Sequence, residues 1–313
     1  MALQRIAAAT SLFLLTVVCV SSAQDKNPKT HTLSMDVDLV LVNASVTDSL
    51  RNRPMNGLSK NNFQVWEDKV EQKITQFSSE DVPVSVGIIF DVSGSMGGVT
   101  AVAQRAAATF FKSGTKDDEY FEVMFASRPK VISDFTTDVN KLQQSLLSTP
   151  TKGSTALYDA VYLGLNKLKE SNNPKRALLL ITDGEDNSSR YSFSDVRDFV
   201  REQNIQIYAI DVTGSTFGMS RTLTQMSELT GGQTFFPGGN GLDMKDICRK
   251  IAVELKNQYV IGYRSTNSAK DGAWRKIKVA VNVPRSPYAT TLTVRAKQGY
   301  YAPSGDEVTN KKK

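Results

Sequence analysis

The chain has 313 residues, of which 40% are hydrophobic and 22% charged, with a formal net charge of +6. A chain of this length suggests about two domains and is long enough to bury a substantial core. The basic excess lies partly in the final Lys311-Lys312-Lys313, and the sequence has no basic helix or basic-aromatic alternation. The composition therefore does not indicate nucleic-acid binding.

The first 23 residues have the pattern of a secretory signal peptide. Arg5 supplies the positive charge, residues 6–20 form an apolar run, and Ser21-Ser22-Ala23 offers a cleavage site of small residues. A membrane anchor is the rival interpretation, but a run of about 15 residues is shorter than the roughly 20 that a spanning helix needs. A lipoprotein modified at Cys19 is a further alternative. The residue before the cysteine is Val18, where such a signal would have Gly or Ala, and this argues against it. We expect a secreted, periplasmic or cell-surface protein of a bacterium.

Cleavage would leave Cys248 as the remaining cysteine, so no intrachain disulfide could form. The chain must then be stabilised by its core, and disulfide-free export fits a bacterial envelope better than an animal extracellular space. Cys248 lies among Ile247, Ile251 and Leu255 at helical spacing. This pattern predicts a buried, unreactive thiol.

Short strands are predicted on both sides of the middle of the chain. On the amino-terminal side, the apolar phase of residues 33–46 changes near Leu41-Val42, which we interpret as a bulge, and strands follow at 63–67 and 72–77. On the carboxyl-terminal side, strands are predicted at 259–263, 274–283 and 291–296. The few strands at each end would not be stable without a partner sheet. We therefore expect both ends to combine into one small β-sandwich. Two unrelated flanking extensions are the alternative.

Between these ends, strands and helices alternate. Buried strands are predicted at 84–90, 120–125, 130–135, 175–182, 205–212 and 233–236, and helices at 99–112, 139–147, 156–165, 194–201, 221–229 and 242–257. The three-residue link Ser127-Arg128-Pro129 predicts one antiparallel hairpin. The remaining order predicts an α/β fold: a doubly wound, mostly parallel sheet with helices on both faces, inserted in the sandwich.

Oxygen-bearing side chains follow the ends of two of these strands and open one helix. Asp91, Ser93 and Ser95 follow the first strand, Thr155 opens the helix at 156, and Asp183 ends the strand 175–182. The carboxyl edge of such a sheet is where ligands bind. Carboxylate and hydroxyl oxygens suit Mg²⁺ or Mn²⁺ rather than zinc, so the five residues are candidate metal ligands.

These residues, in the order Asp91-x-Ser93-x-Ser95, Thr155 and Thr182-Asp183-Gly184, resemble the metal-ion-dependent adhesion site of the von Willebrand factor type A domain. The resemblance covers roughly residues 82–256 and implies a Rossmann-like fold. It also implies that the two serines and Thr155 touch the ion directly, that the two aspartates hold it largely through water, and that an acidic group of a partner completes the shell. The two-ended arrangement also resembles exported bacterial von Willebrand A-related proteins, through Phe63, Val65, Glu67, Asp68, Gln72, Ile74, Phe77 and residues 299–303.

The sequence does not indicate an enzyme. Its one histidine, His31, lies in the amino-terminal segment, which excludes a Ser-His-Asp triad at the sheet edge, and no phosphate-binding loop motif is present. Metal-assisted hydrolysis remains an alternative, but no dedicated general base is found.

We therefore expect an exported, metal-ion-dependent protein-binding module, of an adhesion or scaffold type, that captures a Glu or Asp side chain of a protein partner. The alternative is a structural cell-envelope protein in which the cation only stabilises the loops. The expected rim of the site is Met96, Thr151, Lys152, Arg190, Tyr191 and Phe217.

The predicted organisation has five parts. They are the signal peptide (1–23), the amino-terminal half of the sandwich (24–81), the von Willebrand factor A domain (82–256), the carboxyl-terminal half of the sandwich (257–303) and a disordered basic tail (304–313).

Overall fold

The computed structural model describes residues 39–304 except 52, 148–150, 214–219, 239–241 and 284–290. The predicted signal peptide, nearly all of the basic tail and Phe217 lie outside the described residues. No helix in the described part of the chain is long and apolar enough to cross a membrane.

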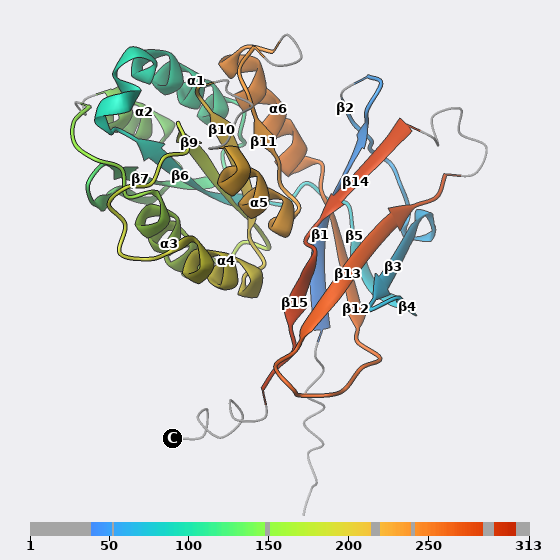
Figure 1. The fold of residues 1–313 in the computed structure, drawn as a ribbon. Helices are drawn as coiled ribbons and strands as arrows, with labels where there is room; N and C mark the ends of the chain where they lie inside the picture. Colours follow the sequence, from blue (N-terminus) through green and yellow to red (C-terminus); the bar gives the residue numbers. More distant parts are fainter. Residues whose placement is uncertain are drawn as a thin grey trace, which may run out of the picture. The chain divides into compact units, whose positions relative to one another are not determined.

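A six-stranded sheet forms the centre of the α/β part, in the order β11-β10-β9-β6-β7-β8 (Figure 1). Every neighbouring pair is parallel except β7 and β8, which form the predicted antiparallel hairpin. The doubly wound, mostly parallel sheet is thus confirmed. The strands are β6 (Val84–Asp91), β7 (Glu119–Phe125), β8 (Pro129–Thr136), β9 (Lys175–Thr182), β10 (Gln206–Asp211) and β11 (Thr234–Phe235).

Helices cover both faces of this sheet. One hydrophobic cluster joins the sheet to α1, α2 and α6, and a second joins it to α3, α4 and α5. Along β6, Ile88 and Phe90 belong to the first cluster and Ile89 to the second, because successive side chains of a strand point to opposite faces. The helices are α1 (Thr100–Lys112), α2 (Val139–Leu147), α3 (Leu157–Leu168), α4 (Phe193–Glu202), α5 (Ser220–Thr230) and α6 (Met244–Lys256).

The flanking segments form two further sheets, and each sheet mixes strands from both ends of the chain. One has the order β14-β1-β12-β5, with β2 paired to β1, and the other has the order β15-β13-β3-β4. A shared cluster that includes Val42, Val65 and Ile261 lies between them, so the two ends form one sandwich. The strands are β1 (Leu39–Asp48), β2 (Arg53–Pro54), β3 (Phe63–Glu67), β4 (Val70–Gln72), β5 (Ile74–Ser78), β12 (Tyr259–Arg264), β13 (Trp274–Val281), β14 (Leu292–Ala296) and β15 (Gly299–Tyr301).

The predicted bulge near Leu41-Val42 is wrong. β1 pairs with β12 in unbroken register from Leu39, opposite Arg264, to Ala44, opposite Tyr259. The change of apolar phase has another cause: residues 42–48 are buried on both faces, so the strict alternation of a half-exposed strand is lost. The register shift in this sheet lies between β12 and β5, at Gly262.

The strand predicted at 72–77 is observed as β5, but it begins at Ile74, because the chain changes sheets at Lys73. β4 pairs with β3 in one sheet, whereas β5 pairs with β12 in the other. β3 and β4 are joined by a two-residue turn in which Asp68 and Lys69 have φ of 47° and 72°. Such a switch between packed sheets is made at a bend in the chain.

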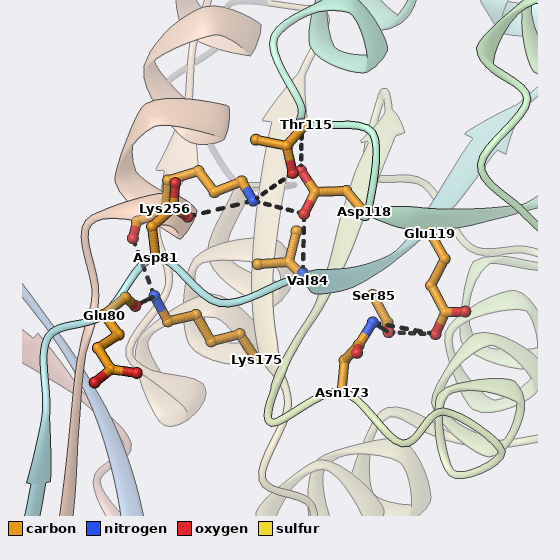
Figure 2. Close-up of polar contacts among 10 residues, drawn as sticks. All are labelled: Glu80, Asp81, Val84, Ser85, Thr115, Asp118, Glu119, Asn173, Lys175 and Lys256. Carbon is orange, nitrogen blue, oxygen red and sulfur yellow. Dashed lines mark hydrogen bonds and ion pairs between the residues drawn. The ribbon is translucent and has the colours of Figure 1, made fainter.

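A polar cluster joins the two segments that connect the sandwich to the α/β part (Figure 2). The buried Lys175 Nζ donates to the backbone carbonyl oxygens of Glu80, before β6, and Lys256, at the end of α6, both at 3.0 Å. The Nζ of Lys256 lies 2.6 Å from Asp118 and 3.4 Å from Asp81. The entering and leaving segments are thereby tied together at the amino end of β9, the end of the sheet opposite the one that carries Asp91.

Candidate metal centre

Asp91 is the last residue of β6 and is completely buried. Its Oδ1 accepts the backbone N–H of Ser93 at 2.8 Å, and its Oδ2 accepts the hydroxyl of Thr182 at 2.7 Å. Burial raises the pKa of Asp91 and the nearby Asp183 carboxylate adds to the rise, although these hydrogen bonds oppose it. The carboxylate is therefore fixed in position by both oxygens.

The two serines of the first loop lie side by side. The hydroxyl oxygens of Ser93 and Ser95 are 3.1 Å apart, with Ser93 buried and Ser95 exposed. The chain then turns into the 3₁₀ helix η2 (Gly94–Gly98) before α1. This turn presents two hydroxyls at one point of the sheet edge, one of them open to solvent.

The second loop, which carries Thr155, is held against the first by its backbone. The N–H of Gly94 donates to the carbonyl oxygen of Gly153 at 3.0 Å. Gly153 has φ of +99°, and a Cβ built there would lie 2.7 Å from the Ser127 hydroxyl, so a larger residue does not fit without strain. Two residues later Thr155 is buried at the start of α3.

The third loop follows β9 and is joined to the second through Asn187. The side-chain oxygen of Asn187 accepts the N–H of Thr155 at 2.8 Å, and the N–H of Asn187 donates to the carbonyl oxygen of Thr155 at 2.9 Å. Asp183 is buried, and its Oδ1 accepts the N–H of Glu185 at 3.1 Å. The three loops are thus linked pairwise by hydrogen bonds at one edge of the sheet.

Thr182 and Asn187 position the site and were not among the metal ligands predicted from the sequence. Thr182 directly precedes Asp183, and its hydroxyl both donates to Asp91 and accepts the N–H of Gly184. In the sequence, Asn187 is one of several polar residues that follow Asp183. Its role depends on the spatial contact between two loops, which no local pattern signals.

The donor set of these loops fits a hard cation. All five predicted side chains offer oxygen, and within the described residues the Thr155 hydroxyl and the Asp183 Oδ2 have no hydrogen-bond partner. No cluster of three or more His, Cys, Asp or Glu in the described part of the chain is arranged to hold a metal. A cation here would therefore depend on hydroxyls and two carboxylates, a set suited to Mg²⁺ or Mn²⁺.

The predicted rim needs one correction. Met96 is completely buried, because η2 turns its apolar side chain inward. Lys152 and Arg190 are exposed, Thr151 is half-buried, and Tyr191 stacks on Tyr162 with ring centroids 4.1 Å apart.

Other polar groups near the site serve the scaffold. Asp186 accepts the N–H of Tyr158 in the first turn of α3, at 3.1 Å, and Asp211 accepts the N–H of Thr213 at 3.0 Å. The predicted burial of Cys248 is confirmed, and burial raises the pKa of its thiol to about 12.

Residues 86–185 match the family model described as von Willebrand factor type A domain. A curated relative from Borreliella burgdorferi, described as an uncharacterized protein, is 26% identical over 216 residues. The match covers 62% of this chain and 61% of the relative, so the chain spans less than two thirds of that relative's length.

Two solved structures illustrate the similarity in fold. A von Willebrand factor type A protein from Catenulispora acidiphila is 11% identical, with 88% of this chain and 76% of that chain covered and a TM-score of 0.49. BatB from Bacteroides thetaiotaomicron is 18% identical, with 55% and 99% covered and a TM-score of 0.45. The similarity to these two structures is too weak to support the family match, which depends on the sequence of residues 86–185 alone. The predicted family is confirmed: the chain contains a von Willebrand factor type A domain, matched over residues 86–185.

Proposed function

We propose that the protein is an exported, metal-ion-dependent binding module of an adhesion or scaffold type. Its candidate metal centre would capture a Glu or Asp side chain of a protein partner through Mg²⁺ or Mn²⁺. One observation supports this most: three hydrogen-bonded loops gather two carboxylates and three hydroxyls at the carboxyl edge of the sheet. The proposed export depends on the pattern of the first 23 residues.

The residues have distinct roles in this proposal. Following the family resemblance, the hydroxyls of Ser93, Ser95 and Thr155 contact the cation, and Asp91 and Asp183 hold it through water. The bound cation supplies positive charge for an anionic ligand. Because the direct contacts would be neutral hydroxyls and the two carboxylates would act through water, the cation's charge is screened less than by directly bound carboxylates, which favours a carboxylate of a partner.

Binding, rather than catalysis, is the proposed activity. Both oxygens of the buried Asp91 accept hydrogen bonds, from Ser93 and Thr182, so the side chain is held in one position. A carboxyl group fixed in this way suits the holding of a cation and its waters.

The cation dependence can be tested by thermal unfolding with Mg²⁺, Mn²⁺ or EDTA. We expect the ions to raise the melting temperature, because a ligand that binds only the folded state stabilises it, by about 2.7 kcal/mol at 100 times Kd. Asp91→Ala and Asp183→Ala should remove this response while the fold is kept. Asp117→Ala, at an exposed carboxylate of the loop before β7, is the matched control and should keep it. A wild-type melting temperature that does not change with Mg²⁺, Mn²⁺ or EDTA contradicts the proposal.

The alternative of a cation that only stabilises the loops is separated by Thr155→Ala. We expect this variant to lose EDTA-sensitive retention of a partner from envelope extract, with its unfolding free energy in the absence of metal unchanged within about 1 kcal/mol. Retention that is unaffected by the substitution and by EDTA favours the structural role.

A further inference from the structure

The outer face of the sheet β15-β13-β3-β4 carries a group of lysines around a tryptophan. Lys276 and Lys278 are two residues apart on β13 and point to the same side. Lys278 lies opposite Trp66 of β3, so these two side chains share that face, and Lys69 lies in the following turn. We call Trp66, Lys69, Lys276 and Lys278 the lysine–tryptophan face; together they line a hollow of about 350 Å³.

The positive charges of this face are not neutralised by the protein. All three lysines are exposed, and none forms an ion pair with another described residue. Two carboxylates lie at its margin: Asp68 accepts the backbone N–H of Lys276 at 2.9 Å, and Glu71 lies opposite Trp66 on β4. Neither is within ion-pair distance of the lysines, so the hollow is left with three ammonium groups facing solvent.

The two tryptophans of the chain differ in what covers them. Trp274 points to the same outer side, but its ring is contacted by Tyr301, with centroids 5.0 Å apart, and by the Arg201 guanidinium at 5.0 Å. The Trp66 ring has the Lys278 ammonium 5.6 Å from its centre and no aromatic ring against it within the described residues. A half-buried tryptophan that lines a hollow, with a lysine ammonium but no second ring against it, is unusual for a sheet face that only meets water.

The chemistry of the face selects a ligand class. The flat apolar face of an indole packs against the C–H face of a sugar ring, and compact lysine ammonium groups pair with carboxylates as point charges. The face lacks arginine, the residue that recognises phosphates and guanine bidentately. We propose that the lysine–tryptophan face binds an acidic polysaccharide, a polymer of uronic-acid sugars, with a sugar ring on Trp66 and its carboxylates at the lysines.

Fluorescence of Trp66 tests this directly. In the Trp274→Phe variant Trp66 is the single tryptophan of the chain. We expect its emission to change saturably on titration with polygalacturonate, with the apparent Kd increasing with salt, and to stay unchanged with neutral dextran. An emission that does not respond to polygalacturonate overturns the proposal.

A charge-matched pair of variants separates the site from general electrostatics. In the same background, Lys276→Glu/Lys278→Glu should weaken polygalacturonate binding at least tenfold. Lys116→Glu/Lys130→Glu, at two exposed lysines of the α/β part, changes the net charge equally and should weaken it less than twofold. Melting temperatures show that both variants fold. Equal losses in the two variants, or tighter binding of oligothymidylate than of polygalacturonate, overturn the proposal.

Discussion

Glu122 of β7 is a buried carboxyl group outside the candidate metal centre. Its Oε2 accepts the hydroxyl of Ser145, and its Oε1 has no partner in the described part of the chain. Burial raises the pKa of Glu122 from 4.5 to about 7. Because the folded pKa lies above the unfolded one, the contribution of Glu122 to stability is present below about pH 4.5 and is lost as pH rises through 7.

Glu122→Gln should therefore flatten the pH dependence of stability. We expect the loss of unfolding free energy between pH 5 and pH 8 to be smaller than in the wild type by about 2–3 kcal/mol. Urea unfolding at a series of pH values measures this. Glu71→Gln, at an exposed position, should leave the profile unchanged. The same pH slope in Glu122→Gln and wild type would contradict the raised pKa.

The residues that offer ligand atoms in the candidate metal centre could be predicted from the sequence, because each lies where a buried strand ends or a helix begins. The residues that position them could not. Thr182 and Asn187 act across loops that are distant in sequence, and whether Met96 points outward or inward depends on the 3₁₀ turn that contains it. Local periodicity carries no information about such contacts.

At the scale of the elements, the α5 helix ends at a glycine that a larger residue could not replace. Gly231 has φ of +82°, and a Cβ there would lie 2.5 Å from the carbonyl carbon of Ala296. Gly57 has a similar φ of +77° with nothing within 4 Å of its would-be Cβ. Gly57→Ala thus measures the cost of the left-handed backbone alone, about 1–2 kcal/mol.

We expect Gly231→Ala to lower the unfolding free energy by more than Gly57→Ala, by at least about 2 kcal/mol beyond it, because the clash adds to the backbone strain. Urea unfolding of the two variants side by side gives the difference. Equal losses would show that α5 and the Ala296 backbone separate easily.

Lys175 holds together the two connections between the sandwich and the α/β part (Figure 2). Lys175→Met keeps most of the side-chain volume but leaves the carbonyl oxygens of Glu80 and Lys256 without this donor. We expect a loss of about 1–3 kcal/mol and faster proteolysis at residues 79–83. Lys130→Met, at an exposed position, is the control. Proteolysis at the wild-type rate would show that the connections are held by other contacts.

The order of strands and helices could be predicted, because periods of two and 3.6 residues are local properties. The incorrect predictions concern strands that contact more than one neighbouring sheet or element. β1 is covered on both faces over residues 42–48, which imitates a bulge, and the chain passes from β4 to β5 across a sheet corner without a change of pattern. The burial of β1 and the change of sheet between β4 and β5 both depend on how the two sheets pack together. Local sequence patterns carry no information about that packing.

At the scale of the whole molecule, an ion pair links the sandwich to the α/β part. Arg295 of β14 lies 2.6 Å from Glu254 of α6, which is 2% exposed and also accepts the hydroxyl of Tyr208 at 2.9 Å. Arg295→Met removes this arginine from a buried carboxylate and should cost about 2–4 kcal/mol. Arg249→Met breaks an exposed pair with Asp246 on the same helix and should cost less than about 1 kcal/mol. Denaturant unfolding compares the two, and equal costs would show that the buried pair adds no stability.

The mixed composition of the two flanking sheets also fixes an order of events during synthesis. Leu39 pairs with Arg264, whereas all six strands of the central sheet lie between residues 84 and 235. The earliest strands to leave the ribosome can form the local pairs β1–β2 and β3–β4, but they must wait for β12, β13 and β14, while the α/β part already holds all the partners it needs. During that interval the exposed edges of β1, β3 and β5 are the most aggregation-prone surface of the nascent chain.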